Sequence, residues 1–150
     1  MTILPRKKPA AEIDTSLLKE PLLSDGDWVD YKRGWQLFNK HQFWEAHEAW
    51  EAVWRRRPEE SRIFFQGIIQ LAAAYHLLLI KPRFGGMMRN LDKAEEKLRL
   101  FPDCFLRVDV SALLRAIHNA RAEADRLGPS RLEEFADELV PTVQLRPRPI

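Results

Sequence analysis

The stretch FWEAHEAWEAVW, residues 43–54, combines three tryptophans, three glutamates and one histidine. A helical period of 3.6 residues places four of these side chains on one face, namely His47, Trp50, Glu51 and Trp54. Glu48 lies on the flank of that face. Because burying ionisable groups without partners costs free energy, these groups need partners inside the protein, a metal ion or a ligand. The stretch therefore predicts a helix that carries a polar site.

The length and composition of the chain indicate a single globular domain. With 150 residues, of which 45% are hydrophobic and 31% charged, the chain has enough apolar material for its own core. The formal net charge of +2 is too small to favour nucleic acid or an anionic membrane as a partner. The single cysteine, Cys104, excludes an internal disulfide, and its apolar neighbours predict a packed or half-buried thiol. No apolar leader follows Met1, so we expect a cytoplasmic protein.

Three regions follow one another along the chain. Residues 1–23 contain prolines and no sustained helical pattern, which is typical of an extended or disordered arm. Residues 24–140 repeat helical spacing and form the expected helical domain. Residues 141–150 are rich in proline and arginine, and we expect an extended tail on the surface.

The helical domain is expected to contain about five or six helices. The cluster Ser24–Asp27 is a helix start, and Lys81-Pro82 and Gly128-Pro129 are stop signals for two later helices. Ser130 and Glu133 have the spacing of a capping box for a last short helix. The longer helices are expected at residues 24–39, 43–54, 63–80, 87–100 and 109–127. No strand pairing is expected, so the sequence predicts an all-α, single-domain helical bundle in antiparallel hairpins.

Residues 63–80 are apolar on nearly every side and, at about 27 Å, approach the length of a membrane span. Gln66, Gln70 and His76 lie within this segment, and the amphipathic helices on both sides need a core to cover. These features favour a central buried helix, and we expect no membrane partner. The following Gly85-Gly86 predicts a turn or a close helix approach.

Three motifs of this chain occur together in a known family. They are FWEAHEAWEAVW at residues 43–54, FQGIIQLAAAYH at residues 65–76 and FGGMMRNLDKA at residues 84–94. In their order and spacing they resemble the domain-of-unknown-function family 309, over residues 30–125. The resemblance implies an all-helical fold. For function it implies only a tag as a metal-dependent hydrolase, with no established activity.

The order His47-Glu48-x-x-Glu51 is similar to the metallopeptidase pattern H-E-x-x-H, with glutamate in place of the second histidine. Residues four apart on a helix converge on one ion, and the glutamate beside the first ligand can take a proton from metal-bound water. His47 and Glu51 would then be metal ligands, and Glu48 the catalytic base. His76 on the apolar helix is the best third ligand. Zinc or another divalent ion is the expected metal, and metal-assisted hydrolysis is the expected reaction.

The same polar groups can also be satisfied without an ion. In this interpretation Gln66 and Gln70 bridge the glutamates, while His47 donates a hydrogen bond to Glu51 or to a carbonyl. In either case the polar site lies between the second and third helices. Its lining residues are expected to be Gln66, Gln70, Trp50 and Trp54.

A third interpretation concerns the hairpin of the first two helices. Its small, aromatic and proline positions are spaced like those of a tetratricopeptide repeat, at Gly34, Ala46, Trp50 and Pro58. Such hairpins bind peptides, so the alternative function is a non-catalytic interaction module. One repeat is recognisable, whereas a stable array needs about three. A small molecule or a peptide fits as the partner, and the substrate, the metal and the oligomeric state are left open.

Overall fold

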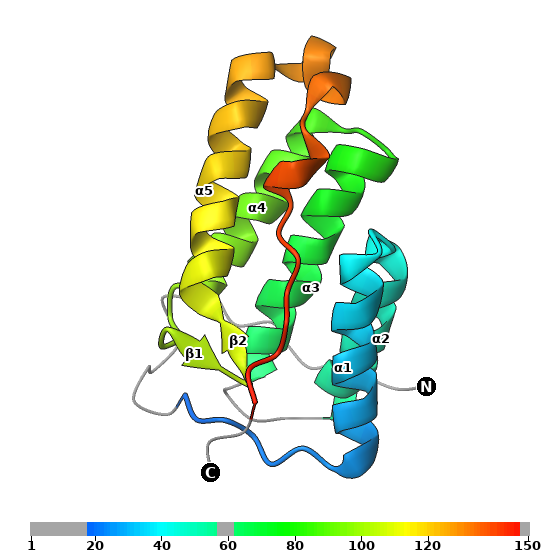
Figure 1. The fold of residues 1–150 in the computed structure, drawn as a ribbon, viewed down its shortest axis with the longest axis vertical. Coiled ribbons are helices and arrows are strands. Elements are labelled where there is room, and N and C mark those ends of the chain that lie inside the picture. Colours follow the sequence, from blue (N-terminus) through cyan, green and yellow to red (C-terminus); the bar gives the residue numbers. More distant parts are fainter. Residues whose placement is uncertain (1–17, 57–61, 148–150) are drawn as a thin grey trace.

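The computed structural model describes residues 18–56 and 62–147. Over these residues the chain is mostly helical, and helices α1 to α5 pack against one another in antiparallel hairpins (Figure 1). The predicted all-α class and number of helices are therefore confirmed. Most of the expected N-terminal arm, the proline at position 58 and the last three residues of the tail lie outside the described residues.

The first hairpin consists of α1 (Asp25–Asn39) and α2 (Phe43–Arg56). The predicted helix start is confirmed, because the hydroxyl oxygen of Ser24 accepts a hydrogen bond from the amide of Asp27 at 3.1 Å. The turn between the helices includes His41, whose φ of 61° lies in the left-handed region. This turn lets α2 fold back along α1.

Close packing of a glycine against an indole holds this hairpin together. A Cβ atom added to Gly34 would lie 2.0 Å from Nε1 of Trp50. The same Nε1 donates a hydrogen bond to the carbonyl oxygen of Tyr31 at 3.1 Å. The small and aromatic positions of the tetratricopeptide-like spacing are therefore in contact. The surrounding core is largely aromatic and contains Tyr31, Trp35, Phe38, Phe43, Trp50, Phe65 and Tyr75.

The central segment is α3 (Ile63–Tyr75), which continues directly as the π-helix η4 (His76–Ile80). Among the described residues, Ile63–Ile80 is the one helix long and apolar enough to cross a membrane, and 61% of it is buried inside the protein. The helix packs against α2 and against α4. This burial agrees with the predicted central helix of the bundle.

The next helix, α4 (Phe84–Leu98), runs antiparallel to α3. Near its start Gly86 lies close to Leu77, and near its end Leu98 lies close to Gly67. Of the two alternatives predicted for Gly85-Gly86, the turn does not occur, because both glycines lie in the first turn of α4. The expected close helix approach does occur, since a Cβ atom on Gly86 would lie 2.9 Å from the Leu77 side chain.

A short hairpin leads into the last long helix. Strands β1 (Cys104–Phe105) and β2 (Val108–Asp109) pair antiparallel, and α5 (Val110–Leu127) follows with the side chain of Asp109 as its N-cap. The expectation of no strand pairing is therefore wrong. Strands of two residues are too short to show the alternation by which a sequence reveals strands. The predicted packed thiol is also wrong, because Cys104 is exposed.

Two short 3₁₀ helices follow, η5 (Pro129–Glu134) and η6 (Asp137–Leu139). A last short helix was predicted here, but its predicted capping box is wrong. Gly128, with a φ of 72°, occupies the N-cap position, and no side chain caps the helix. Ser130 therefore lies inside the turn instead of preceding it.

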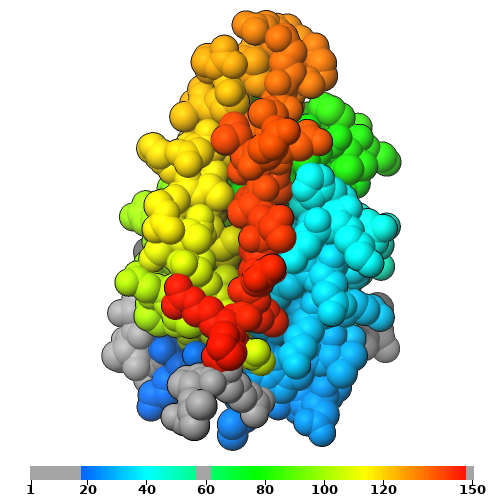
Figure 2. All heavy atoms as spheres, viewed as in Figure 1, coloured from blue at the N-terminus to red at the C-terminus, as the bar shows by residue number. Residues whose placement is uncertain are grey.

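The C-terminal residues 140–147, named here the strap, run in an extended conformation across the bundle. Figures 1 and 2 show the strap in red, between α5 in yellow and α1 in blue. The side-chain amide of Asn39 donates to the carbonyl oxygen of Val143 at 2.7 Å and accepts from its amide at 2.8 Å. Further along, the amide of Arg146 donates to the carbonyl oxygen of Arg107 at 2.8 Å. These bonds tie the strap to both sides of the bundle.

Candidate functional site

An indole and two imidazoles meet where α2 runs beside η4. The Trp44 ring stacks on the His47 ring, with centroids 4.8 Å apart and planes inclined by 13°. The His76 ring lies 5.6 Å from the same indole. Trp44 is 49% exposed, whereas both histidines are half-buried. We name these three residues the Trp44 cluster.

The backbone geometry of η4 begins at this cluster. The carbonyl oxygen of His76 accepts a hydrogen bond from the amide of Lys81 at 2.9 Å, five residues further along. π-Helical turns are rare and often occur at functional sites. The sequence predicted one continuous helix to Ile80, and nothing in its apolar run marks the change of hydrogen-bond pattern at His76.

Two of the three predicted metal ligands lie close together. Nε2 of His47 is 3.5 Å from Oε2 of Glu51. The other oxygen of Glu51 accepts a hydrogen bond from Arg55 at 2.5 Å. Glu48, the predicted catalytic base, is exposed on the same helix. The local spacing on α2 therefore produces an ion-pair row along the helix.

The predicted metal site is not assembled. Within residues 18–56 and 62–147, no group of three or more histidine, cysteine, aspartate or glutamate side chains could hold a metal ion. His47, Glu51 and His76 therefore do not form the expected ligand set beside Glu48. The reason lies in their other contacts, because Arg55 binds Glu51 and the indole packs against both imidazoles. These residues do not fit the tetrahedral zinc site that the hydrolase interpretation requires.

The two glutamines predicted to line the site have different surroundings. Gln66 is 3% exposed, and within the described part of the chain its Nε2 atom has no acceptor. Gln70 is half-buried, and its Oε1 atom accepts a hydrogen bond from Nζ of Lys97 at 2.7 Å. The hydrogen-bond partner of Gln70 is therefore a lysine of α4, whereas a glutamate of α2 was expected. The sequence signal for it was the position of Lys97 on the apolar stripe of Ala94 and Leu98, where its aliphatic stem can be buried.

The two tryptophans expected to line the polar site are buried in the core. Trp50 is fully buried, with its ring 4.5 Å from that of Trp35 on α1. Trp54 is 4% exposed and lies 4.9 Å below the guanidinium of Arg62. Trp44, on the same helix, projects from the core. Its position one helical turn before the polar flank of α2 was the signal that the sequence analysis missed.

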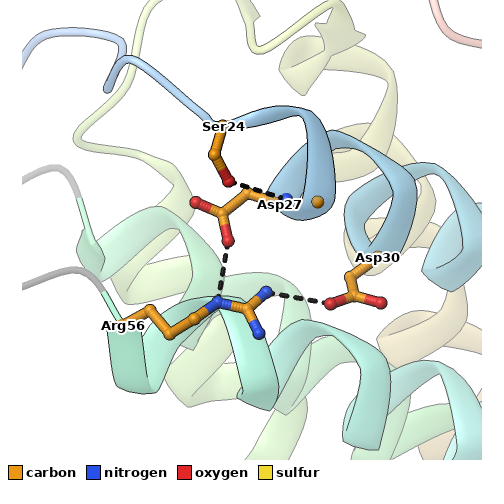
Figure 3. A pocket seen from close by; sticks show the side chains of 5 residues that line it. Ser24, Asp27, Asp30 and Arg56 are labelled. Atoms are coloured by element: carbon orange, nitrogen blue, oxygen red, sulfur yellow. Dashed lines mark hydrogen bonds and ion pairs between the residues drawn. The ribbon is translucent and has the colours of Figure 1, made fainter.

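A second polar group surrounds a pocket of about 510 Å³ at the start of α1, lined by Ser24, Gly26, Asp27, Asp30 and Arg56 (Figure 3). From α2, Nε of Arg56 donates to Asp27 at 2.8 Å, and Nη2 donates to Asp30 at 2.9 Å. The hydrogen bond to Asp30 raises the pKa of the guanidinium. Because one cation faces two carboxylates, this group is explained by its role in holding α1 against α2. The helical period of α2 does not reveal this group, because its carboxylates come from another helix.

A half-exposed face of α3 and η4 lies between α2 and α4. Its residues recur at helical spacing and are Ile69, Gln70, Ala73, His76, Leu77 and Ile80. Ile80 is 50% exposed, and His76 joins this row to the half-exposed Trp44. We name the six residues together with Trp44 the open face. It is mainly apolar and brings a tryptophan, a small residue and one imidazole, that of His76, onto one surface.

The comparisons with known proteins bear on the part of the chain that contains this face. The model of DUF309, a domain of unknown function, matches residues 31–89. This range runs from the middle of α1 into the second turn of α4 and includes the whole open face. The matched description names no activity, and no curated protein matches the chain. Residues 31–89 of the chain are therefore similar to this domain of unknown function.

Proposed function

We propose that this chain is a non-catalytic interaction module whose open face docks a helix of another polypeptide. The observation that carries this proposal is the half-exposed Trp44 ring, stacked on His47 and bordering the apolar row of α3 and η4. Tryptophan is enriched among the few residues that supply most of the free energy of protein association. Because stacking already restricts the ring, little side-chain entropy is lost when a partner covers it.

The form of the open face suits a helical ligand. Ile69, Ala73, Leu77 and Ile80 follow one line along α3 and η4, with the small Ala73 near the middle. Helices pack by fitting the side-chain ridges of one into the grooves of the other, and amphipathic helices bind through apolar residues at this spacing. The open face offers such a row with a helix on either side, α2 and α4.

The metal-dependent hydrolase implied by the family resemblance is the competing function. Its predicted ligands are engaged in contacts with Arg55 and with Trp44. We expect added zinc or manganese to leave the hydrolysis of model esters and phosphoesters at background, equally in the wild type and in Glu48→Gln. A metal-stimulated turnover that disappears in Glu48→Gln would overturn the proposal.

Peptide binding tests the open face directly. Helical peptides selected from a display library against the full chain would be labelled and titrated by fluorescence anisotropy. We expect Trp44→Ala and Ala73→Arg each to weaken binding by at least about tenfold, because each alters the centre or edge of the face. Val29→Ala is the matched control, since it removes a 64% exposed apolar side chain from α1.

Circular dichroism and thermal melts would show that each variant keeps its fold. The expected pattern is a loss of affinity in the two open-face variants and none in the control. Equal affinity for all four proteins, or failure to select any peptide, would contradict the interaction function.

A further inference from the structure

We propose that the polypeptide docked on the open face is a second copy of this chain, with its α3 parallel to the first; this inference rests on the proposed function. The argument starts from the helices beside the face. Trp44 of α2 contacts His76, and Gly86 of α4 lies against the neighbouring Leu77. Trp44 and Gly86 therefore lie at the same level on opposite sides of η4. Since α2 and α4 both run antiparallel to α3, they continue from this level in the same direction.

At this level the two flanking helices have complementary shapes. On α2 the indole of Trp44 projects into solvent. On α4, Gly85 and Gly86 present backbone without side chains, and Gly85 is exposed. Glycine weakens a helix, so its presence here calls for a reason. Within the described residues, a Cβ atom on Gly85 would meet only the flexible end of Arg89, at 3.2 Å. Packing inside the protomer therefore does not require this glycine, whereas a docked indole does.

The next two turns carry opposite charges on the two flanks. One turn beyond Trp44, α2 carries the exposed Glu48, and α4 carries the exposed Arg89 at the corresponding level. Another turn on, Glu51 on α2 corresponds to the exposed Lys93 on α4. Arg55 already pairs with Glu51, so the stronger complementarity is between Glu48 and Arg89. The charges on α2 therefore complement those on α4. Like charges would face each other if α2 met a second α2, or α4 a second α4.

The symmetry of a dimer decides how these flanks meet. A two-fold axis parallel to α3 exchanges the sides, so α2 of one protomer faces α4 of its partner at the same level. Trp44 then covers the partner's Gly85, and Glu48 faces the partner's Arg89, in both halves of the interface. A two-fold axis perpendicular to α3 within the interface would place α2 against α2, with carboxylates facing carboxylates. Charge and shape therefore both select the parallel arrangement.

Cysteine crosslinking tests the arrangement in the full chain, with Cys104→Ser as the background because that thiol is exposed. Parallel α3 helices bring each residue of the row beside its own copy, so Ile69→Cys and Leu77→Cys should each form a disulfide-linked dimer on mild oxidation. Helix axes in contact are about 8–10 Å apart, which brings facing Cα atoms within disulfide range. Asn119→Cys, at an exposed position on α5, is the control and should remain monomeric. Crosslinking only in a mixture of the Ile69→Cys and Leu77→Cys proteins would show antiparallel helices and overturn the inference.

Sedimentation equilibrium tests whether the side chains on α2 and α4 contribute to self-association. We expect Glu48→Arg and Arg89→Glu each to weaken self-association by at least about fivefold, and the double variant to restore it, because the swap rebuilds the same pair in reverse. Gly85→Gln should weaken self-association by at least about tenfold, whereas Gly26→Gln, at an exposed glycine of α1, should not.

The outcomes separate this inference from the function on which it rests. A wild type that stays monomeric while selected peptides bind in a Trp44-dependent way would overturn the second copy and leave the interaction function standing. A dimer that is unaffected by Gly85→Gln and Ala73→Arg would use another surface and would also overturn the inference. A wild type that neither self-associates nor binds a selected peptide would overturn both proposals.

Discussion

At the scale of single residues, Gly34 sets the distance between the first two helices. It is buried in α1, and the ring of Trp50 occupies the space that a side chain would need. The indole nitrogen also donates to the carbonyl oxygen of Tyr31 on the same helix. The absence of a side chain at Gly34 therefore lets the Trp50 ring reach the carbonyl oxygen of Tyr31.

We predict that Gly34→Ala destabilises the protein by about 1–3 kcal/mol, because its Cβ atom would overlap the Trp50 ring and displace the indole from its acceptor. Urea unfolding followed by tryptophan fluorescence measures the loss. Gly26→Ala is the control on the same helix, since its Cβ atom would meet only Ser24 at 3.9 Å. Equal unfolding midpoints for the two variants would show that the close approach is not what holds the hairpin.

The residues of the candidate site were predictable only where their contacts are local. His47 and Glu51 are four apart on one helix, so the helical period alone brings them together. The contact between Trp44 and His76 joins two helices, so the helical period of either one cannot predict it. The metal hypothesis depended on a contact of the same kind, between His76 and the pair on α2, and no such group is found among the described residues.

At the scale of elements, the strap is attached to α1 by one side chain. Asn39 ends α1 and forms two hydrogen bonds with the backbone of Val143, as a neighbouring strand would do. Lys32, Trp35, Gln36, Asn39 and Arg107 line a pocket of about 300 Å³ with the strap residues Val143, Gln144 and Leu145. The strap therefore lies over a small hollow and depends on a few polar anchors.

We predict that Asn39→Ala speeds hydrogen exchange of the Val143 amide by at least about fivefold, because each lost hydrogen bond is worth about 1 kcal/mol. Amide exchange followed by nuclear magnetic resonance measures the rate. Gln36→Ala, which changes an exposed residue beside the same pocket, should leave that rate unchanged. An unchanged rate in Asn39→Ala would mean that apolar packing alone holds the strap.

Long helices were predictable from the sequence, and the short elements were not. The 3.6-residue period and the start signal at Ser24 mark α1, and the same reasoning marks α5 before Gly128. The π-helix at His76 and the pairing of Phe105 with Val108 arise from packing around them, since their own residues carry no distinguishing period. The start of α4 was hidden as well, because glycines such as Gly85 and Gly86 occur in turns more often than at the start of helices.

At the scale of the whole molecule, both tyrosines of the sequence are buried in one aromatic core. The hydroxyl of Tyr31 donates to the carbonyl oxygen of Leu106 at 2.7 Å, which joins α1 to the β-hairpin. Burial raises the pKa of Tyr31 and of Tyr75 above the ordinary value of 10.0. The folded protein thus favours the neutral phenol of both residues.

This burial predicts how stability depends on alkaline pH. Above about pH 10 the unfolded chain releases the phenolic protons while the folded chain retains them, so the free energy of unfolding falls as the pH rises. Below that pH the contribution is fully present. We expect phenolate absorbance to appear in one step that coincides with the loss of helical circular dichroism. Gradual titration of either tyrosine near pH 10, with the helices intact, would contradict the burial of that residue.

The all-α architecture as a whole was predictable because apolar periodicity covers most of the chain. The path of the strap was not, because a segment such as Pro141–Pro147 has no period that assigns it to a face. The open face was equally hidden, since an apolar helix such as Ile63–Ile80 does not show which of its sides its neighbours leave uncovered.

The docking claim is tested most directly by titrating a selected helical peptide into the ¹⁵N-labelled chain and mapping the shifted amide and indole resonances. We predict that the indole of Trp44 and the amides of Ile69, Ala73 and Ile80 shift together, while Val143 of the strap stays unchanged. Shifts centred on the strap, or on the pocket around Arg56, would place the binding surface elsewhere and contradict docking on the open face.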